Sequence, residues 1–288
     1  MLKELLVGMI IEDIQKVLKF NKMYAYNFML IPYVDVTLYP LLDLAAVPHI
    51  DGLHLGFVIA DADKDPSWGG SHKVSSDFMD KRIKGFKKKL VCSFGGAAGK
   101  ELALVCKDEF ELFEKYKSVV DKYGFKTLDF DIEGQALSDY KANDRRRKAI
   151  KLLKKAFPKL NIQVTLPVSP SGLSYEAMQL VDDFQVVNIM AMDYGSVKEM
   201  GGAACEAATN AHKQTGKPIG ITVMIGKNDT GEIFTLEDAK QVASFAKINH
   251  WVYFVSFWSV HRDRGFGGGL ESSSQIPQKP WEFSFILK

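Results

Sequence analysis

Cysteine is scarce in this sequence, and the few that occur lie far apart. The three cysteines, Cys92, Cys106 and Cys205, are odd in number and widely spaced, so they form no disulfide framework. No pair of cysteines and histidines has the spacing of a zinc site, and the six histidines are scattered along the chain. We therefore expect a protein that needs neither a disulfide scaffold, nor a metal, nor a cofactor.

A strong charge of either sign is also lacking. Lysine and arginine total 37 and aspartate and glutamate 35, which leaves a formal net charge of +2. This balance gives no argument for nucleic-acid or membrane binding. The lysine-rich runs at 81–89 and 144–155 carry apolar residues at helical spacing, so we interpret them as solvated helix faces. We expect neither nucleic acid nor membrane as a partner.

Long hydrophobic runs are missing as well. The apolar run at 5–11 is too short to cross a bilayer, and Glu12 and Asp13 follow it directly. No small-residue cleavage site is present, so a signal peptide fits poorly. We interpret residues 1–30 as an N-terminal extension, an amphipathic helix packed on the outside of the fold.

Nucleotide-binding glycine motifs and linkers are the last absences. No G-x-G-x-x-G follows the first strand candidate, as a doubly wound dinucleotide-binding fold would require. The glycine-rich stretch 265–270 comes after the final strand candidate and leads to no long helix, so we predict a loop there. Since no low-complexity linker interrupts the chain, we predict one catalytic domain over residues 31–288.

Short apolar runs alternate with helical patterns along most of the chain. The runs occupy residues 33–37, 53–60, 90–96, 127–133, 162–168, 185–193, 218–226 and 251–260. Their nearly continuous apolar character indicates parallel strands buried on both faces. The sequence therefore predicts an α/β fold, a single-domain (β/α)8 TIM barrel, with an open doubly wound sheet as the competing architecture.

Two helix starts are predicted from capping residues. Asn143 is placed to act as the N-cap of a helix over 143–157. Thr235, followed three residues later by Asp238, predicts a near capping box at the start of a helix over 235–249.

Three carboxylates stand at alternate positions of the fourth run, at Asp129, Asp131 and Glu133. Strand side chains alternate, so all three point to one face, where like charges repel. The residues between them are apolar and suit packing against helices, so we expect the charged face to line the barrel interior, with Glu133 nearest the mouth. An edge strand with solvent-facing carboxylates is the alternative.

Crowded carboxylates predict acid–base chemistry. Mutual repulsion raises the pKa of one member, and a glutamic acid that stays protonated near neutral pH is a general acid. Cleavage of a glycosidic bond uses such an acid. Aromatic side chains at other strand ends would stack on a sugar, and Trp258 and Tyr194 are the candidates. Trp258 alone fits a core position as well, but its place across the mouth from Glu133 favours binding.

The carboxylate stretch resembles a known signature. LDFDIEG (128–134) looks like the D-x-x-D-x-D-x-E motif of family 18 glycoside hydrolases, the chitinases and their relatives. In that motif, Glu133 falls on the catalytic acid, and Asp131 and Asp129 fall on the two inner aspartates. Lys126 occupies the outermost aspartate position, which is a departure at the position least involved in the chemistry.

Four further segments resemble the same family in the same order. CSFGGAAGKELA (92–103) is similar to its S-x-G-G motif, VNIMAMDYG (187–195) to its M-x-Y-D motif, ITVMIGKND (221–229) to its seventh strand and VSFWSVHRDRG (255–265) to its last strand. The resemblance covers roughly residues 30 to 287 and is closest to the bacterial chitinase D-like branch. Between the seventh strand and its helix, no room is left for the α+β insertion that some members carry.

The resemblance also implies which residues bind substrate. Met192 stands where many members have a tyrosine that holds the acetamido oxygen of the sugar, so Tyr194 is a candidate to supply that hydroxyl. The substrate-binding candidates are Asp193, Met190, Met192, Tyr194, Trp258, Ser93, Gly95 and Tyr33.

A substrate-assisted retaining mechanism is what the resemblance implies for the reaction. Glu133 protonates the leaving oxygen, and the N-acetyl carbonyl of the sugar attacks the anomeric carbon. Asp131 orients the acetamido group, Asp129 alternates with it as a proton partner, and Asp193 binds acetamido or hydroxyl groups. The implied activity is that of an endo-acting chitinase with an open cleft.

Other functions remain as alternatives. An endo-β-N-acetylglucosaminidase acting on N-glycans shares the fold and motif, and a chitin-binding lectin shares the fold but usually lacks the acid. A barrel enzyme of another chemistry is disfavoured, since no phosphate loop, Schiff-base lysine context or metal cluster is present. We expect chitin or chitooligosaccharides as the partner and a monomeric protein. Insoluble chitin implies a secreted protein, although the N-terminus lacks a standard export signal.

Overall fold

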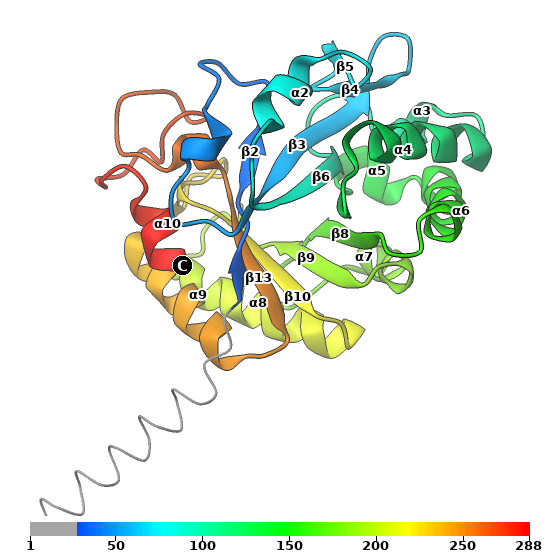
Figure 1. The fold of residues 1–288 in the computed structure, drawn as a ribbon. Helices are drawn as coiled ribbons and strands as arrows, with labels where there is room; N and C mark the ends of the chain where they lie inside the picture. The colour runs from blue at the N-terminus through cyan, green and yellow to red at the C-terminus, as the bar shows by residue number, and fades with distance from the viewer. Residues whose placement is uncertain (1–27) are drawn as a thin grey trace, which may run out of the picture.

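The computed structural model describes residues 28–288 (Figure 1). Residues 1–27 of the predicted N-terminal extension lie outside the described residues. The end of that prediction is wrong, because Met29–Leu30 forms strand β1 of the sheet instead of extending the helix. The barrel therefore begins two residues before the predicted boundary.

Parallel strands form the centre of the molecule. The order across the sheet is β1 (Met29–Leu30), β13 (Val252–Trp258), β10 (Ile219–Met224), β9 (Val186–Met190), β8 (Asn161–Pro167), β7 (Thr127–Asp131), β6 (Lys89–Gly95) and β3 (Gly52–Ala60). Each of the eight predicted runs overlaps one of these strands or β2 (Tyr33–Asp35). The prediction of alternating, mostly parallel strands is confirmed, because buried parallel strands are recognisable from their apolar runs.

The first strand closes the sheet on itself. β1 pairs with β13 at one edge, and β2, two residues further along, pairs with β3 at the other edge. Backbone hydrogen bonds continue the ladder between them, from the Ile31 N–H to the Val255 carbonyl (2.9 Å) and from the His54 N–H to the Pro32 carbonyl (2.8 Å). The segment 29–35 thus joins both edges, as a TIM barrel requires.

Helices surround the barrel, and Figure 1 shows α4, α6, α8 and α9 on its outside. The helices are α2 (Phe78–Ile83), α3 (Leu102–Val105), α4 (Glu109–Tyr123), α5 (Gly134–Ser138), α6 (Tyr140–Ala156), α7 (Tyr175–Met178), α8 (Met200–Thr215), α9 (Leu236–Ile248) and α10 (Glu282–Leu287). Short 3-10 turns lie at Leu44–Ala46, Val181–Asp183 and Val260–Arg262. Within the part of the chain described, no helix is long and apolar enough to span a bilayer.

The capping predictions have different outcomes. Thr235 and Asp238 form a full capping box at the start of α9, which confirms that prediction. The prediction for Asn143 is wrong, because α6 begins three residues earlier. Asp139 is its N-cap and accepts hydrogen bonds from the first-turn backbone, so a stronger cap upstream takes the role.

Alternation along β7 separates an apolar from a polar side. The ring of Phe130 stacks on Phe94 at 5.3 Å and meets Tyr116 of α4 edge-on at 5.0 Å. Asp129 and Asp131 are buried on the opposite side, in the barrel interior. The strand therefore presents its carboxylates inward, as alternation predicted.

A short hairpin takes the place of an insertion between β10 and α9. It consists of β11 (Gly226–Lys227) and β12 (Ile233–Phe234), paired antiparallel. Gly226 has a positive φ of 73°, and a Cβ there would lie 2.0 Å from the carbonyl oxygen of Ser274, so only glycine fits. The absence of an α+β domain at this point of the described chain agrees with the sequence analysis.

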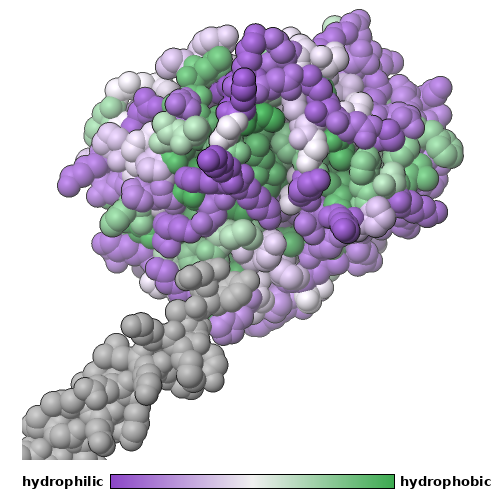
Figure 2. Space-filling view, in the orientation of Figure 1, coloured by the Kyte–Doolittle hydropathy of each residue, from purple (hydrophilic) through white to green (hydrophobic). Residues whose placement is uncertain are grey.

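The outer surface is mixed in character. Figure 2 shows that hydrophilic residues cover much of the face seen in Figure 1, with apolar surface between them. Such a mixture is usual for folded proteins, since apolar atoms contribute more than half of an ordinary protein surface.

A buried histidine lies within the barrel, below the carboxylates. The His54 ring Nδ1 lies 2.7 Å from the Ile31 carbonyl, which can only accept, so we assign the proton to Nδ1. Nε2 then accepts a hydrogen bond from Gln163 (2.7 Å), whose amide also donates to Asp129 (3.2 Å). Burial lowers the pKa of His54 from 6.5 to about 4, so the ring is neutral at pH 7.

The neutral histidine makes stability depend on pH. The unfolded chain binds this proton below about pH 6.5, whereas the folded protein resists it down to about pH 4. The contribution to the free energy of unfolding is therefore fully present above the unfolded pKa and falls as the pH drops, by about 3 kcal/mol in total. We expect His54→Gln to flatten the curve of unfolding free energy against pH between 7 and 4, measured by urea denaturation. The same change at exposed His49 is the control, and an equally steep curve in His54→Gln would contradict the assignment.

Candidate active site

A cleft of about 490 Å³ opens at the carboxyl ends of the barrel strands. Its lining includes the last residues of β7, β8, β9, β10 and β13, which are Asp131, Pro167, Met190, Met224 and Trp258. The complete lining is Tyr33, Phe57, Ala97, Asp131, Glu133, Thr165, Pro167, Val168, Ser169, Met190, Met192, Asp193, Tyr194, Thr222, Met224, Asp229 and Trp258. Reacting groups of TIM-barrel enzymes lie at this end of the barrel.

Most of the predicted site residues meet in this cleft. Those that line it are Tyr33, Asp131, Glu133, Met190, Met192, Asp193, Tyr194 and Trp258. Asp129, Ser93 and Gly95 are buried beneath it and are not part of its lining. The structure therefore brings together residues that are spread from the first to the last strand.

Asp129 is the centre of a buried hydrogen-bond network. Its Oδ2 accepts from the Tyr33 hydroxyl (2.9 Å) and from Ser93 Oγ (2.5 Å). Its Oδ1 accepts from Thr165 Oγ1 (2.7 Å) and from Gln163 Nε2 (3.2 Å). These donors come from three different strands, β2, β6 and β8, so they hold the side chain in one orientation. Where we expected Ser93 to contact substrate, the structure places it as a fully buried donor to Asp129.

Gly95 also has a structural position rather than the expected substrate contact. Its φ is +93°, and a Cβ at this residue would lie 2.1 Å from the carbonyl oxygen of Asp131. The next N–H, of Gly96, donates to that same carbonyl at 3.1 Å. The absence of a side chain at Gly95 thus lets the end of β6 approach the end of β7, where the carboxylates lie.

Asp131 and Glu133 form the upper part of the carboxylate column. Asp131 is 5% exposed, and its Oδ1 has no hydrogen-bond partner among the described residues. Burial, followed by the charges of Glu133 and Asp129, raises the pKa of Asp131 well above its ordinary value. Glu133 is half-buried on extended backbone, and burial together with the charge of Asp193 raises its pKa. Both carboxyls are therefore protonated more readily than exposed ones.

Three aromatic rings form one wall of the cleft. The Trp258 ring stacks on Phe57 with centroids 5.7 Å apart, and Tyr33 lies 5.9 Å from Phe57 and 6.2 Å from Trp258. Flat apolar rings of this kind offer a surface to the apolar face of a sugar. The sequence analysis missed Phe57, because the run 53–60 is apolar at nearly every position and alternation does not show which side chains face inward.

The loop after β9 supplies the remaining predicted residues. Asp193 has a positive φ of 58°, and its Oδ1 accepts a hydrogen bond from the Asp229 N–H at 2.9 Å. Burial and the charge of Asp229 raise the pKa of Asp193. The Tyr194 hydroxyl is buried and has no hydrogen-bond partner within the described part of the chain. This loop thus places a carboxyl and an unpartnered hydroxyl in the cleft.

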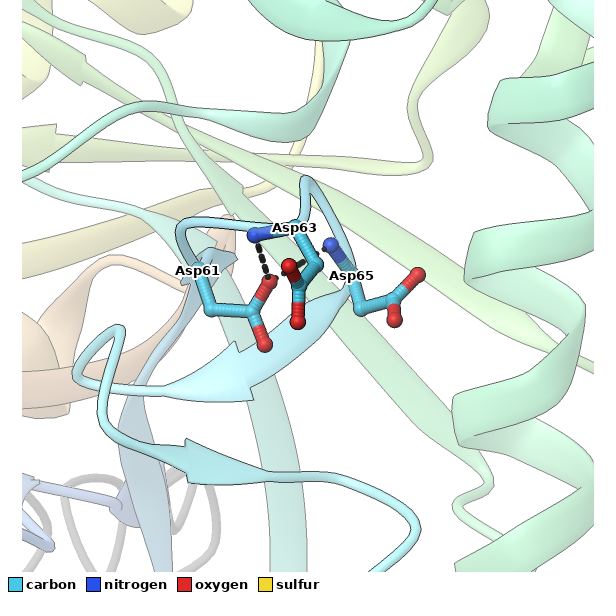
Figure 3. Close-up of side chains that lie close together, drawn as sticks. All are labelled: Asp61, Asp63 and Asp65. Atoms are coloured by element: carbon cyan, nitrogen blue, oxygen red, sulfur yellow. Dashed lines mark hydrogen bonds between the residues drawn. The ribbon is translucent and has the colours of Figure 1, made fainter.

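A separate group of carboxylates lies on the loop that leaves β3. Figure 3 shows Asp61, Asp63 and Asp65 close together, with Asp61 accepting hydrogen bonds from the other two backbone N–H groups (2.9 Å each). Their oxygens lie near enough to one another to hold a cation. The Lys73 ammonium already lies 2.9 Å from Asp63 and 3.3 Å from Asp65, so it balances their charge, and none of the three lines the cleft.

Curated relatives of this chain are chitin-degrading proteins by name. A probable bifunctional chitinase/lysozyme of Escherichia coli (strain K12) is 32% identical over 281 residues, which cover 83% of this chain and 31% of that protein. Endochitinase 11 of Metarhizium anisopliae is 30% identical over 272 residues, 81% of this chain and 52% of that protein. The chain thus spans about a third to a half of the length of these relatives.

Solved structures resemble the whole barrel. The catalytic domain of a hyperthermophilic chitinase from Pyrococcus furiosus has a TM-score of 0.79 and 27% identity, over 92% of this chain and 96% of that one. Catalytic-site mutants of active domain 2 of the thermostable chitinase from the same organism, complexed with chito-oligosaccharides, have a TM-score of 0.80 and 26% identity, over 91% and 94% of the two chains. This chain, with its barrel and its carboxylate column, is thus similar in sequence and structure to known chitinase domains.

The sequence pattern of the family described as "Glycosyl hydrolases family 18" matches residues 46–223, which is more than half of the chain. The matched region runs from before β3 to the end of β10 and includes the carboxylate column on β7. With this match, the similar barrel and the expected column of carboxylates, the chain belongs to glycosyl hydrolase family 18.

Proposed function

We propose that this protein hydrolyses β-1,4-linked N-acetylglucosamine polymers, with Glu133 as the proton donor. The observation that carries the proposal is the column of carboxyls along β7, from Asp129 in the core through Asp131 to Glu133 in the cleft. Relatives named as chitinases and the structural likeness to a chitinase complexed with chito-oligosaccharides support this choice of substrate.

Glu133 suits the role of general acid. Burial and the charge of Asp193 raise its pKa, so more of it is protonated near neutral pH than of an exposed glutamate. No hydrogen bond from its side chain caps the following helix α5, so the carboxyl is available to the cleft. It can therefore donate a proton to the leaving glycosidic oxygen.

Asp131 is unsuited to attack the sugar directly. Burial and the charges of Glu133 and Asp129 raise the pKa of Asp131, which favours its protonated form, and a protonated carboxyl is a poor nucleophile. The scheme in which a second carboxylate forms a glycosyl-enzyme is therefore disfavoured. A substrate that carries its own nucleophile, the 2-acetamido group, avoids this difficulty.

The reaction then proceeds in two steps. Glu133 gives its proton to the glycosidic oxygen while the acetamido carbonyl oxygen bonds to the anomeric carbon, which breaks the glycosidic bond and leaves an oxazolinium ion. Asp131 passes its proton to Asp129, and as a carboxylate with an unpartnered Oδ1 it receives the acetamido N–H and balances the positive charge. Asp129 below it alternates as the partner for the shared proton. Glu133 next removes a proton from water, which attacks the anomeric carbon from the leaving-group side. The bond from the acetamido oxygen to that carbon breaks, which restores the acetamido group and the original configuration.

Residues around the column bind the reacting sugar. Trp258, supported by Phe57, provides the stacking surface beneath the ring. Asp193 and Tyr194 lie on the loop across the cleft, where they can hold acetamido and hydroxyl groups. Met192 occupies the position of the expected tyrosine, and the nearby Tyr194 hydroxyl, free of protein partners among the described residues, is the replacement donor.

The acid role predicts the effect of one conservative change. Glu133→Gln keeps the shape and a hydrogen-bond donor but cannot transfer the proton, so we expect kcat on a chromogenic chitooligosaccharide to fall by about 10²–10⁴-fold or more. Binding of unmodified chitooligosaccharide, measured by calorimetry, should be retained and serves as the control. Near-normal turnover in Glu133→Gln would refute the assigned acid, and a wild-type protein inactive on every N-acetylglucosamine polymer would refute the substrate.

The acetamido role of Tyr194 predicts a second effect. Tyr194→Phe removes one hydroxyl and keeps the ring, so we expect kcat to fall about tenfold, the equivalent of one lost hydrogen bond in the transition state. Trp258→Phe, which alters the stacking surface without removing a hydroxyl, is the comparison and should act more on KM. An unchanged kcat in Tyr194→Phe would exclude this hydroxyl from the role.

The short hairpin after β10 predicts the cleavage pattern. Because the short hairpin of β11 and β12 takes the place of a walled insertion, we expect the cleft to admit a long chain. We expect endo-cleavage, with products of mixed length at the earliest time points on soluble long chitin, measured by mass spectrometry. Disaccharide as the only early product would contradict it.

A further inference from the structure

The side chain of Asn228 connects two loops at the mouth of the barrel. Asn228 is fully buried, and its Nδ2 donates to the carbonyl oxygens of Met224 (2.8 Å), at the end of β10, and Gly226 (3.1 Å), at the start of β11. Its Oδ1 accepts the backbone N–H of Asp193 at 3.1 Å, on the loop after β9. Every polar atom of this amide side chain is therefore engaged, and only its Oδ1 reaches across to the neighbouring loop.

The side chain of Asp193 also bonds to the loop that carries Asn228. Its Oδ1 accepts the backbone N–H groups of Asp229 (2.9 Å) and Thr230 (3.4 Å), and Thr230 Oγ1 accepts the N–H of Gly195 (3.3 Å). The two loops are thus joined in both directions. Asp193 itself holds a left-handed backbone (φ 58°), a conformation that a non-glycine residue keeps only where its surroundings enforce it.

We propose that Asn228 is a positioning residue for the reaction, which holds Asp193 in the cleft beside Glu133 and thereby sets the upper pH limit of activity. The inference rests on the proposed function of Glu133 as the general acid. It adds a residue outside the cleft lining, since Asn228 is buried and acts only through Asp193.

Activity is expected to depend on pH through the charged groups at the mouth of the barrel. After burial, the charge of Asp193 is what raises the pKa of Glu133. Asp193 in turn faces Asp229 and Glu232, which raise its pKa, while Arg262 carries the opposite charge nearby. Arg262 is buried under the hairpin, where it donates to the Ile225 and Lys227 carbonyls, and it does not line the cleft.

The remaining titratable groups at Glu133 belong to other elements. Asp131 lies below it at the end of β7, and the Tyr194 hydroxyl lies on the loop after β9. Neither depends on Asn228 for a hydrogen bond. Loss of Asn228 therefore acts on Glu133 through the freedom it gives to Asp193.

The expected change has a definite sign. Without the Asn228 amide, the backbone N–H of Asp193 loses its partner and the two loops keep only the bonds that Asp193 and Thr230 make. The Asp193 carboxylate is then less firmly held, and its negative charge leaves the neighbourhood of Glu133 for part of the time. The pKa of Glu133 then falls toward that of an ordinary glutamate, and the acid form is lost at lower pH. Since a general acid works only when protonated, the alkaline limb of the kcat profile moves to lower pH.

The test compares three variants. We expect the alkaline limb of kcat against pH, with a chromogenic chitooligosaccharide, to shift down by about half a unit or more in Asn228→Ala and at least as far in Asp193→Asn. The double variant should match Asp193→Asn alone, because Asn228 acts through that carboxylate. Ser274→Ala, which removes another buried polar side chain beside the hairpin, is the matched control and should keep the wild-type profile.

Two results would overturn the proposal. One is a folded Asn228→Ala protein with the wild-type alkaline limb, and the other is a further downward shift when Asn228→Ala is added to Asp193→Asn. If Asn228→Ala does not fold, as judged by its thermal midpoint, the milder Asn228→Ser takes its place. NMR titration of the Glu133 carboxyl in wild type and variant measures the pKa of Glu133 directly and needs no turnover. It therefore tests the effect of Asn228 even if chitin hydrolysis itself proves wrong.

Discussion

One buried carboxylate, Asp129, and the four hydrogen bonds that it accepts are the constraint on which the interior of this barrel depends. A carboxylate in the core is tolerated only where donors satisfy its oxygens. These donors are Tyr33 on β2, Ser93 on β6, and Gln163 and Thr165 on β8. Because the donors arise on several strands, the register of the barrel and the position of the carboxylate column define each other.

The carboxylate column on β7 and the surrounding loops have different roles, which are rigid positioning and adjustment of acidity. The strands hold Asp129 and Asp131 rigidly, since both lie within buried β7. The loops carry the groups whose charges adjust acidity, notably Asp193 after β9. A rigid core with adjustable loops at its mouth is the general arrangement that lets barrel enzymes keep one scaffold while their chemistry varies.

Much of this arrangement is readable from the sequence, and the failures have physical reasons. Buried parallel strands are recognisable as apolar runs, and the alternation of side chains along a strand placed the three carboxylates on one face of β7. Alternation did not reveal Phe57, since its strand is apolar on both sides. The resemblance to the S-x-G-G motif made Ser93 a substrate-binding candidate, although the structure buries Ser93 beside Asp129. Asn228 left no local signal, because its partner Asp193 is 35 residues away along the chain.

Closure of the barrel by residues 29–35 determines when the barrel can form during synthesis of the chain. The aromatic wall joins Tyr33, from the start of the described chain, to Trp258, near its end. The pairing of β2 with β3 can form early, but the ring cannot close until β13 has been synthesised, so the contacts of highest sequence separation come last. The aromatic wall of the cleft is therefore complete only in the closed ring.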